Sequence, residues 1–248
     1  MRFGSLFSGI GGMDLGLERA GMTVAWQVEI DPWCRRVLAK HWPDVPKYGD
    51  IRELSGRGLA PIDLLARGFP CQPVSEVGSR RGHDDPRWLW PEFARLIREL
   101  RPRFVLLENV ANLLNFGEFG EILSDLSTSG FDAEWSLVSA CSLGASHSRE
   151  RLFLVAYADR RRQEAGGAGR DGDGYALAGW APNTQHLHSA PVFGSRTGRP
   201  SWATEPAVGR VADGVPHRVD RLGGLGNAVV PQVVEWIGRR IMALEPPK

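Results

Sequence analysis

Short apolar runs alternate with amphipathic stretches along the first 159 residues of the chain. Runs of consecutive apolar residues are typical of buried strands, whereas apolar positions spaced three and four apart are typical of helices that pack on a core. Their alternation predicts an α/β domain. We expect strands over residues 2–7, 23–28, 62–66, 104–107, 133–139 and 152–157, and helices over residues 13–20, 32–41, 88–100 and 119–126.

The pattern changes after Asp159. Residues 160–218 are rich in glycine and arginine and show no sustained periodicity, and a flexible surface insertion is one interpretation of such a segment. The α/β pattern then resumes and ends in an expected helix over residues 233–244. We therefore expect one domain built from residues 1–159 and 219–248, with a small Gly-rich insertion between its two parts.

The composition is typical of a globular domain and shows a bias towards arginine. The 248 residues are 42% hydrophobic and 24% charged, which is ordinary for a globular domain. Lysine occurs only at Lys40, Lys47 and Lys248, so arginine carries nearly all positive charge. Arginine suits contacts to phosphate and guanine, although a GC-rich coding bias explains it equally well. No apolar run approaches the roughly 20 residues of a membrane span, and the first residues lack a secretory layout, so we expect a cytoplasmic protein without a membrane partner.

Among the three cysteines, Cys71 occupies an unusual setting. Cys34, Cys71 and Cys141 are an odd number without a close pair, which argues against disulfides and against a four-cysteine zinc site, and we expect no metal. Pro70 and Pro73 bracket Cys71 and stiffen the loop that follows an expected buried strand. Open sheets bind ligands at the carboxyl ends of their strands, so this position favours a nucleophile.

A glycine-rich turn follows the first expected strand, over residues 7–12. Glycines there let the backbone approach a ligand and leave helix N–H groups pointing at it. Glu29 ends the next strand, where its carboxylate could accept hydrogen bonds from ribose hydroxyls. The carboxylate of Asp50 could accept a hydrogen bond from an adenine amino group. Either acid alone is more often a cap or loop carboxylate, but their order after the turn favours a nucleoside ligand. The full dinucleotide fingerprint is absent, which argues against a hydride-transfer enzyme.

Three further charged residues could act on a base. Glu108 follows the expected strand 104–107, and a partly desolvated carboxyl beside a thiol could hold a proton and donate it. Arg149 and Arg151 lie two residues apart on an extended segment, so both guanidinium groups could point into one cleft. A surface Arg-Glu-Arg ladder is the alternative, and without other motifs it is the preferred one.

Several segments in order resemble the motifs of cytosine-5 DNA methyltransferases of bacterial and phage type, in a short form. They are FSGIGGMDLGLERAG, GFPCQPVSEVG, LLENV, SRERLF and GNAVVPQVV, and they span Phe7 to Val234. The resemblance implies a Rossmann-like, S-adenosylmethionine-dependent methyltransferase fold. Its mixed, mostly parallel sheet would carry helices on both faces, and residues 160–218 would form a small target-recognition lobe. The implied cofactor is S-adenosylmethionine, and the implied substrate is double-stranded DNA.

The resemblance also implies roles for individual residues. Cys71 would attack carbon 6 of a flipped-out cytosine, Glu108 would contact N3 and the amine, and Arg151 would contact O2, with Arg149 holding that oxygen or a phosphate. The implied cofactor-binding residues are Phe7, Ser8, Gly9, Ile10, Gly11, Gly12, Glu29, Ile30, Asp50, Ile51, Pro70, Asn227, Ala228 and Val229.

Departures from the family pattern keep alternatives open. Val74, His147 and Ala228 stand where the family usually has Phe, Gln and Ser, and the recognition lobe is short and rich in glycine. A tRNA cytosine methyltransferase shares the catalytic motifs and needs no large groove-reading lobe. A non-catalytic, cofactor-binding partner of a second protein is a further alternative, against which the full catalytic set argues. A cognate restriction endonuclease is a candidate partner, and a monomer is the simpler expectation.

Overall fold

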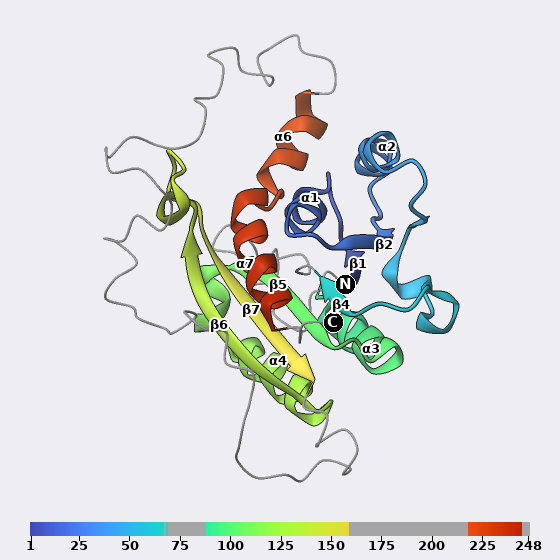
Figure 1. The fold of residues 1–248 in the computed structure, drawn as a ribbon, viewed down its shortest axis with the longest axis vertical. Helices are drawn as coiled ribbons and strands as arrows, with labels where there is room; N and C mark the ends of the chain where they lie inside the picture. The colour runs from blue at the N-terminus through green and yellow to red at the C-terminus, as the bar shows by residue number, and fades with distance from the viewer. Residues whose placement is uncertain (67, 69–87, 159–217, 245–248) are drawn as a thin grey trace.

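The structure is a computed structural model that describes residues 1–66, 68, 88–158 and 218–244 (Figure 1). The Cys71 loop and nearly all of the expected insertion therefore lie outside the described residues, and the expected division into domains stays a prediction. In the described part of the chain, no helix has the length and apolar character that a bilayer span requires.

A seven-stranded sheet forms the centre of the described structure, in the order β3-β2-β1-β4-β5-β7-β6. Only β7 runs antiparallel to its two neighbours, while the other neighbouring pairs are parallel. This confirms the expected mixed, mostly parallel sheet. The strands are β1 (Arg2–Leu6), β2 (Thr23–Val28), β3 (Lys47–Tyr48), β4 (Leu64–Ala66), β5 (Phe104–Val110), β6 (Phe131–Ser139) and β7 (Glu150–Ala158).

Helices cover both faces of the sheet, as expected. On β5, Val105 belongs to a core cluster shared with helices α3 and α4, whereas Leu106 belongs to a second cluster shared with α1 and α7. Successive strand residues point to opposite faces, so these clusters lie on opposite sides of the sheet. The α-helices are α1 (Gly12–Arg19), α2 (Pro32–His41), α3 (Trp90–Leu100), α4 (Gly117–Thr128), α6 (Arg218–Gly226) and α7 (Pro231–Ala243); the short 3₁₀ turns are η1 (Ile51–Glu53), η2 (Gly56–Gly58), η5 (Ala111–Asn115) and η6 (Ala140–Leu143).

Helix α7 packs directly on α1, so the last described helix lies beside the first (Figure 1). The approach is close: a Cβ added at Gly16 would lie 2.5 Å from the Pro231 carbonyl oxygen and 2.5 Å from the Val234 Cβ. Phe3 of β1 shares the same core cluster. Helix α7, beyond the expected insertion, thus shares a hydrophobic core with the first strand and the first helix of the chain.

One strand and one α-helix among the described residues were not anticipated, and several expected boundaries shifted by one to three residues. Strand β3 is only two residues long, so no periodicity marks it. Helix α6 contains three glycines, which have low intrinsic helix propensity. The expected strand 104–107 continues to Val110, and the expected helix 88–100 begins at Trp90.

Candidate active site

The glycine turn, residues 7–12, reverses the chain between β1 and α1. Three of its residues have positive φ, which are Phe7 (49°), Gly9 (54°) and Gly11 (86°). Ser8 is fully buried and fixes the turn, because its N–H donates to the Val28 carbonyl at 3.0 Å and its hydroxyl donates to Ser5 Oγ at 2.9 Å. No side chain caps the N-terminus of α1. The first helical N–H groups therefore lie at the carboxyl edge of the sheet, as an anionic or polar ligand requires.

Glu29 ties this turn to the end of β2. Its carboxylate accepts the N–H of Gly9 at 2.6 Å and the N–H of Asp31 at 2.8 Å, and the side chain is buried. Each carboxylate oxygen can accept more than one hydrogen bond, so these contacts orient the carboxylate and leave it able to accept further hydrogen bonds. Ile30, the next residue, is 59% exposed and offers an apolar surface beside the carboxylate.

Asp50 begins the segment that follows β3. It caps η1 by accepting the Arg52 N–H at 3.0 Å, and it also accepts the Arg52 Nε at 3.0 Å. These hydrogen bonds from Arg52 hold the pKa of the Asp50 carboxyl below its usual range. The Ile51 side chain is buried in the core, so only its backbone could meet a ligand at this position.

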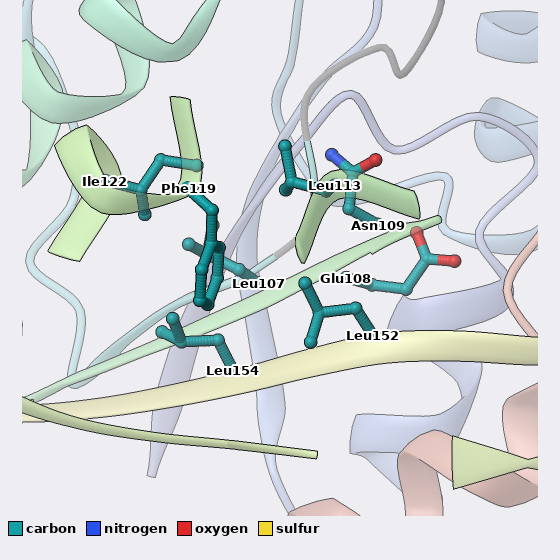
Figure 2. Close-up of a pocket in the computed structure, with 8 residues that line it drawn as sticks. All are labelled: Leu107, Glu108, Asn109, Leu113, Phe119, Ile122, Leu152 and Leu154. Carbon is teal, nitrogen blue, oxygen red and sulfur yellow. The ribbon is translucent and has the colours of Figure 1, made fainter. Parts of the chain in front are cut away.

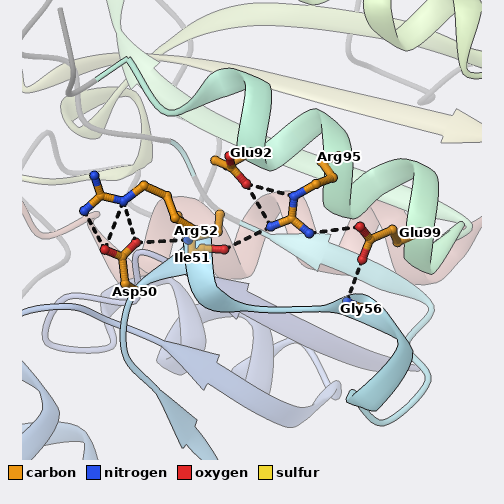
Figure 3. A network of polar contacts seen from close by, with 7 residues as sticks. All are labelled: Asp50, Ile51, Arg52, Gly56, Glu92, Arg95 and Glu99. Atoms are coloured by element: carbon orange, nitrogen blue, oxygen red, sulfur yellow. Dashed lines mark hydrogen bonds and ion pairs between the residues drawn. The ribbon is translucent and has the colours of Figure 1, made fainter.

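Helix α3 anchors the same segment from the other side (Figure 3). Arg95 donates to the Ile51 carbonyl at 3.0 Å and pairs with Glu92 at 2.8 Å and Glu99 at 2.9 Å. Glu99 also accepts the Gly56 N–H at 2.6 Å, and this backbone hydrogen bond is the largest cause of its lowered pKa. Sequence reasoning missed this anchor, although the spacing of the three charges by three and four residues is the signature of paired helix side chains.

Glu108 lies near the carboxyl end of β5 and pairs with Arg151 of the neighbouring β7. The two charged groups are 3.3 Å apart, and their side chains are 13% and 26% exposed. The antiparallel register places Val110 opposite Arg151, which brings the guanidinium back towards Glu108. The structure therefore brings together two of the four predicted catalytic residues.

A small pocket lies between β5, β7 and α4, beside the Glu108 backbone (Figure 2). Figure 2 shows the Glu108 carboxylate pointing away from Phe119 and Ile122. A polar base would leave its hydrogen-bonding groups unpaired among such side chains, so this pocket is a packing gap in the core and not the site of chemistry. It is lined by Leu107, Glu108, Asn109, Leu113, Phe119, Ile122, Leu152 and Leu154.

Gly68 connects the expected nucleophile segment with Glu108. It is buried, and a Cβ added to it would lie 1.5 Å from the Glu108 carbonyl oxygen. Only glycine permits this approach. Cys71 follows three residues later in the sequence and, like Pro70, lies outside the described residues.

Arg149 has different partners from Arg151. Its Nη2 donates to the Gly226 carbonyl at 2.7 Å and to the Ala228 carbonyl at 2.8 Å. The turn formed by residues 226–228 joins α6 to α7 and contains Asn227. The two arginine side chains thus reach two regions: one reaches Glu108, the other reaches this turn.

The 226–228 turn in turn lies against the glycine turn. Val229 is buried, and a Cβ added at Gly12 would lie 2.4 Å from its carbonyl oxygen. Gly224 of α6, which sequence reasoning did not single out, closely approaches Ile10 and the ring of Trp33. The predicted cofactor residues at both ends of the chain are therefore neighbours. Within the ranges that the structure describes, no cluster of three His, Cys, Asp or Glu side chains could hold a metal ion.

Comparison with known proteins gives a consistent result. A family model described as C-5 cytosine-specific DNA methylase matches residues 1–184. The chain is 40% identical over 162 residues to the Type II methyltransferase M.NgoMIV of Neisseria gonorrhoeae, covering 63% of this chain and 52% of that protein. It is 28% identical over 242 residues to the Type II methyltransferase M.MspI of a Moraxella species, covering 90% of this chain and 56% of that protein. The chain thus spans about half the length of these curated relatives.

Solved structures show the same likeness. A putative DNA modification methyltransferase encoded within an Escherichia coli prophage is 31% identical with a TM-score of 0.55, covering 64% of this chain and 47% of that one. The Dnmt2 methyltransferase of S. pombe shares the fold with a TM-score of 0.55 at 20% identity, covering 71% of this chain and 58% of that one. The expected Rossmann-like methyltransferase fold is thereby confirmed.

Proposed function

Because the chain belongs to the family of C-5 cytosine-specific DNA methylases, we propose that it transfers a methyl group from S-adenosylmethionine to carbon 5 of cytosine in double-stranded DNA. One observation carries this proposal beyond the family: Gly68 lies on the backbone of Glu108, and Glu108 pairs with Arg151. Three residues of chain span at most about 11 Å, so a thiol at Cys71 beside the Glu108–Arg151 pair is compatible with this anchor.

The described residues fit S-adenosylmethionine at the carboxyl edge of β1 and β2. The glycine turn offers main-chain groups and an uncapped helix N-terminus, Glu29 is oriented to accept ribose hydroxyls, and exposed Ile30 offers an apolar surface to the adenine. Asp50 would accept the adenine amino group, and residues 227–229 would close the other side. When bound, S-adenosylmethionine would supply a methyl carbon attached to a positively charged sulfur.

The residues of the chain would act on a cytosine that has left the base stack, since its reacting carbons are inaccessible inside the duplex. The Cys71 thiolate forms a bond to carbon 6, and the displaced electron pair makes carbon 5 nucleophilic. Glu108 donates a proton or a hydrogen bond to N3, and Arg151 donates to O2. Carbon 5 would then take the methyl carbon as its bond to sulfur breaks, and the sulfur would leave as an uncharged thioether. Loss of the carbon 5 proton to solvent restores the ring double bond and expels the Cys71 thiolate, and N3 returns any proton it received to Glu108.

This chemistry also suggests roles for the rest of the chain. Residues 160–218 would read the major groove and supply arginine contacts to phosphates. The enzyme would act in the cytoplasm, and action as a monomer is the simpler expectation. Its Type II relatives make a cognate restriction endonuclease a reasonable partner to seek beside it.

The test is transfer of labelled methyl from S-adenosylmethionine to unmethylated duplex DNA, with bulk tRNA in parallel and sequencing of the methylated positions. We expect label at carbon 5 of cytosine in DNA. Label on tRNA alone would refute the DNA substrate while keeping the chemistry.

The nucleophile is tested by Cys71→Ser, with Cys34→Ser as the matched control because Cys34 lies buried in α2. We expect Cys71→Ser to abolish methyl transfer and to leave the affinity for S-adenosylmethionine unchanged, because a hydroxyl is a far weaker nucleophile than a thiolate. Turnover by Cys71→Ser at the rate of the control would exclude Cys71 as the nucleophile.

A further inference from the structure

Arg149 binds backbone on the cofactor side of the molecule. Both bonds come from one guanidinium nitrogen, Nη2, which donates to the carbonyls of Gly226 and Ala228 at 2.7 and 2.8 Å. An NH₂ group of arginine carries two hydrogens, so these two bonds engage both of them. Hydrogen bonds from a charged donor are stronger than neutral ones, and this pair fixes the carbonyls on either side of Asn227.

The residue that follows the fixed turn reaches the glycine turn. Ala228 is followed by buried Val229, whose carbonyl oxygen would lie 2.4 Å from a Cβ added at Gly12. Backbone thus meets backbone here, without a flexible side chain that could absorb a shift. A displacement of the 226–228 turn would therefore be transmitted through Val229 to Gly12, in the first turn of α1 and beside the proposed cofactor site.

We propose that Arg149 is a positioning residue that holds the 226–228 turn against the glycine turn and thereby sets the affinity for S-adenosylmethionine. This inference rests on the proposed function for the identity of the cofactor, and it replaces the contact to O2 or to a phosphate that the family resemblance implied for this residue. Arg151, only two residues away, keeps the role on the base side through its ion pair with Glu108.

The two neighbouring arginines provide a matched pair of variants. Binding of S-adenosylmethionine is measured by calorimetry without DNA for Arg149→Ala, Arg149→Lys and Arg151→Ala, with Arg239→Ala as the control. Arg239 is 62% exposed on α7, and its ion pair among the described residues is with Glu235, four residues before it. We expect Arg149→Ala to weaken binding on the order of tenfold, since water replaces the lost hydrogen bonds only in part.

Arg149→Lys should fall between Arg149→Ala and the wild type, because lysine keeps the charge but cannot offer the planar fork. Arg151→Ala and Arg239→Ala should bind as tightly as the wild type. In steady state, Arg149→Lys should raise KM for S-adenosylmethionine and leave kcat at saturating cofactor within about twofold, as expected when only ground-state binding is lost. A general loss of folding would lower kcat as well, and that result would overturn the inference.

DNA binding separates the two roles of Arg149 directly. Each phosphate contact contributes about one unit to the slope of the logarithm of DNA affinity against the logarithm of salt concentration. Removal of such a contact would therefore make that slope shallower. We expect Arg149→Lys and Arg149→Ala to keep the wild-type slope. Unchanged cofactor affinity together with a reduced slope in Arg149→Ala would overturn the inference. The two proposals can fail separately. If the variants change cofactor affinity as expected but the wild-type protein methylates no DNA, the proposed function is refuted and the inference stands.

Discussion

Replacing Gly68 by alanine places a methyl carbon 1.5 Å from the Glu108 carbonyl oxygen. Cβ atoms essentially never approach other heavy atoms within 3.0 Å, so the two segments must separate by about 1.5 Å or more. The neighbouring atom belongs to the backbone of β5, which lies between β4 and β7 in the sheet. Rotation of a side chain cannot relieve the clash.

The size of the effect follows from this displacement. Overpacking a buried position costs about 1–3 kcal/mol, and a backbone neighbour puts Gly68→Ala at the upper end, near 3 kcal/mol of unfolding free energy. The same shift moves Glu108 relative to the Cys71 segment. A misplacement of about 1 Å costs on the order of 100-fold in rate, so we expect methyl transfer to slow by about that factor.

Urea unfolding and single-turnover methyl transfer at saturating cofactor and DNA measure the two quantities. Gly120→Ala is the matched control, because Gly120 lies inside α4 and its added Cβ would meet nothing within 4 Å. Alanine is a better helix former than glycine, so the control should gain up to about 1 kcal/mol. If Gly68→Ala kept wild-type stability and rate, the close contact between Gly68 and Glu108 would be refuted.

The remaining predictions concern packing, a charged anchor and a buried phenol. Gly16→Val should lower the unfolding free energy by about 3 kcal/mol in urea, because α1 and α7 must separate, and an unchanged midpoint would contradict their contact. Arg95→Ala should weaken binding of S-adenosylmethionine in calorimetry and cost about 1 kcal/mol of stability, whereas Arg239→Ala loses one local pair and should do neither. Burial, aided by Glu134, raises the pKa of Tyr157 to about 12. Because the unfolded state loses this proton near pH 10 first, stability should fall as pH rises from 10 to 12. An ultraviolet titration should show a late-ionising component that Tyr157→Phe removes; its persistence in that variant would refute the assignment.

The fold was largely predictable because its periodicities are strong. Apolar runs located most strands within a residue or two, and helix α2 was expected and found over residues 32–41. The sequence could not show that β5 extends past its apolar part. Glu108 and Asn109 are polar, yet the antiparallel pairing with Phe153 and Leu152 of β7 keeps them in the ladder. Such pairing depends on a strand more than forty residues away, which local patterning does not encode.

The site was predictable in residue types and less so in contacts. The sequence motifs located the glycine turn, Glu29 and Glu108, because the first two follow the apolar strands β1 and β2 and Glu108 follows the apolar part of β5. The division between Arg149 and Arg151 was not predictable from their spacing. Two arginines on one face of an extended segment have long side chains, and which partner each reaches depends on the turn at residues 226–228, supplied by a distant part of the chain.

The packing of α7 on α1 also has a consequence for how the chain matures during translation. Residues 20–230 separate the two helices in the sequence. At roughly 5–20 residues per second, a ribosome needs on the order of ten seconds or more to make the intervening chain. Throughout that interval the nascent chain carries the Gly16 side of α1 without the surface that covers it in the finished fold. The contact between α1 and α7 is therefore among the last parts of the fold to form during synthesis, and so is the approach of Val229 to Gly12.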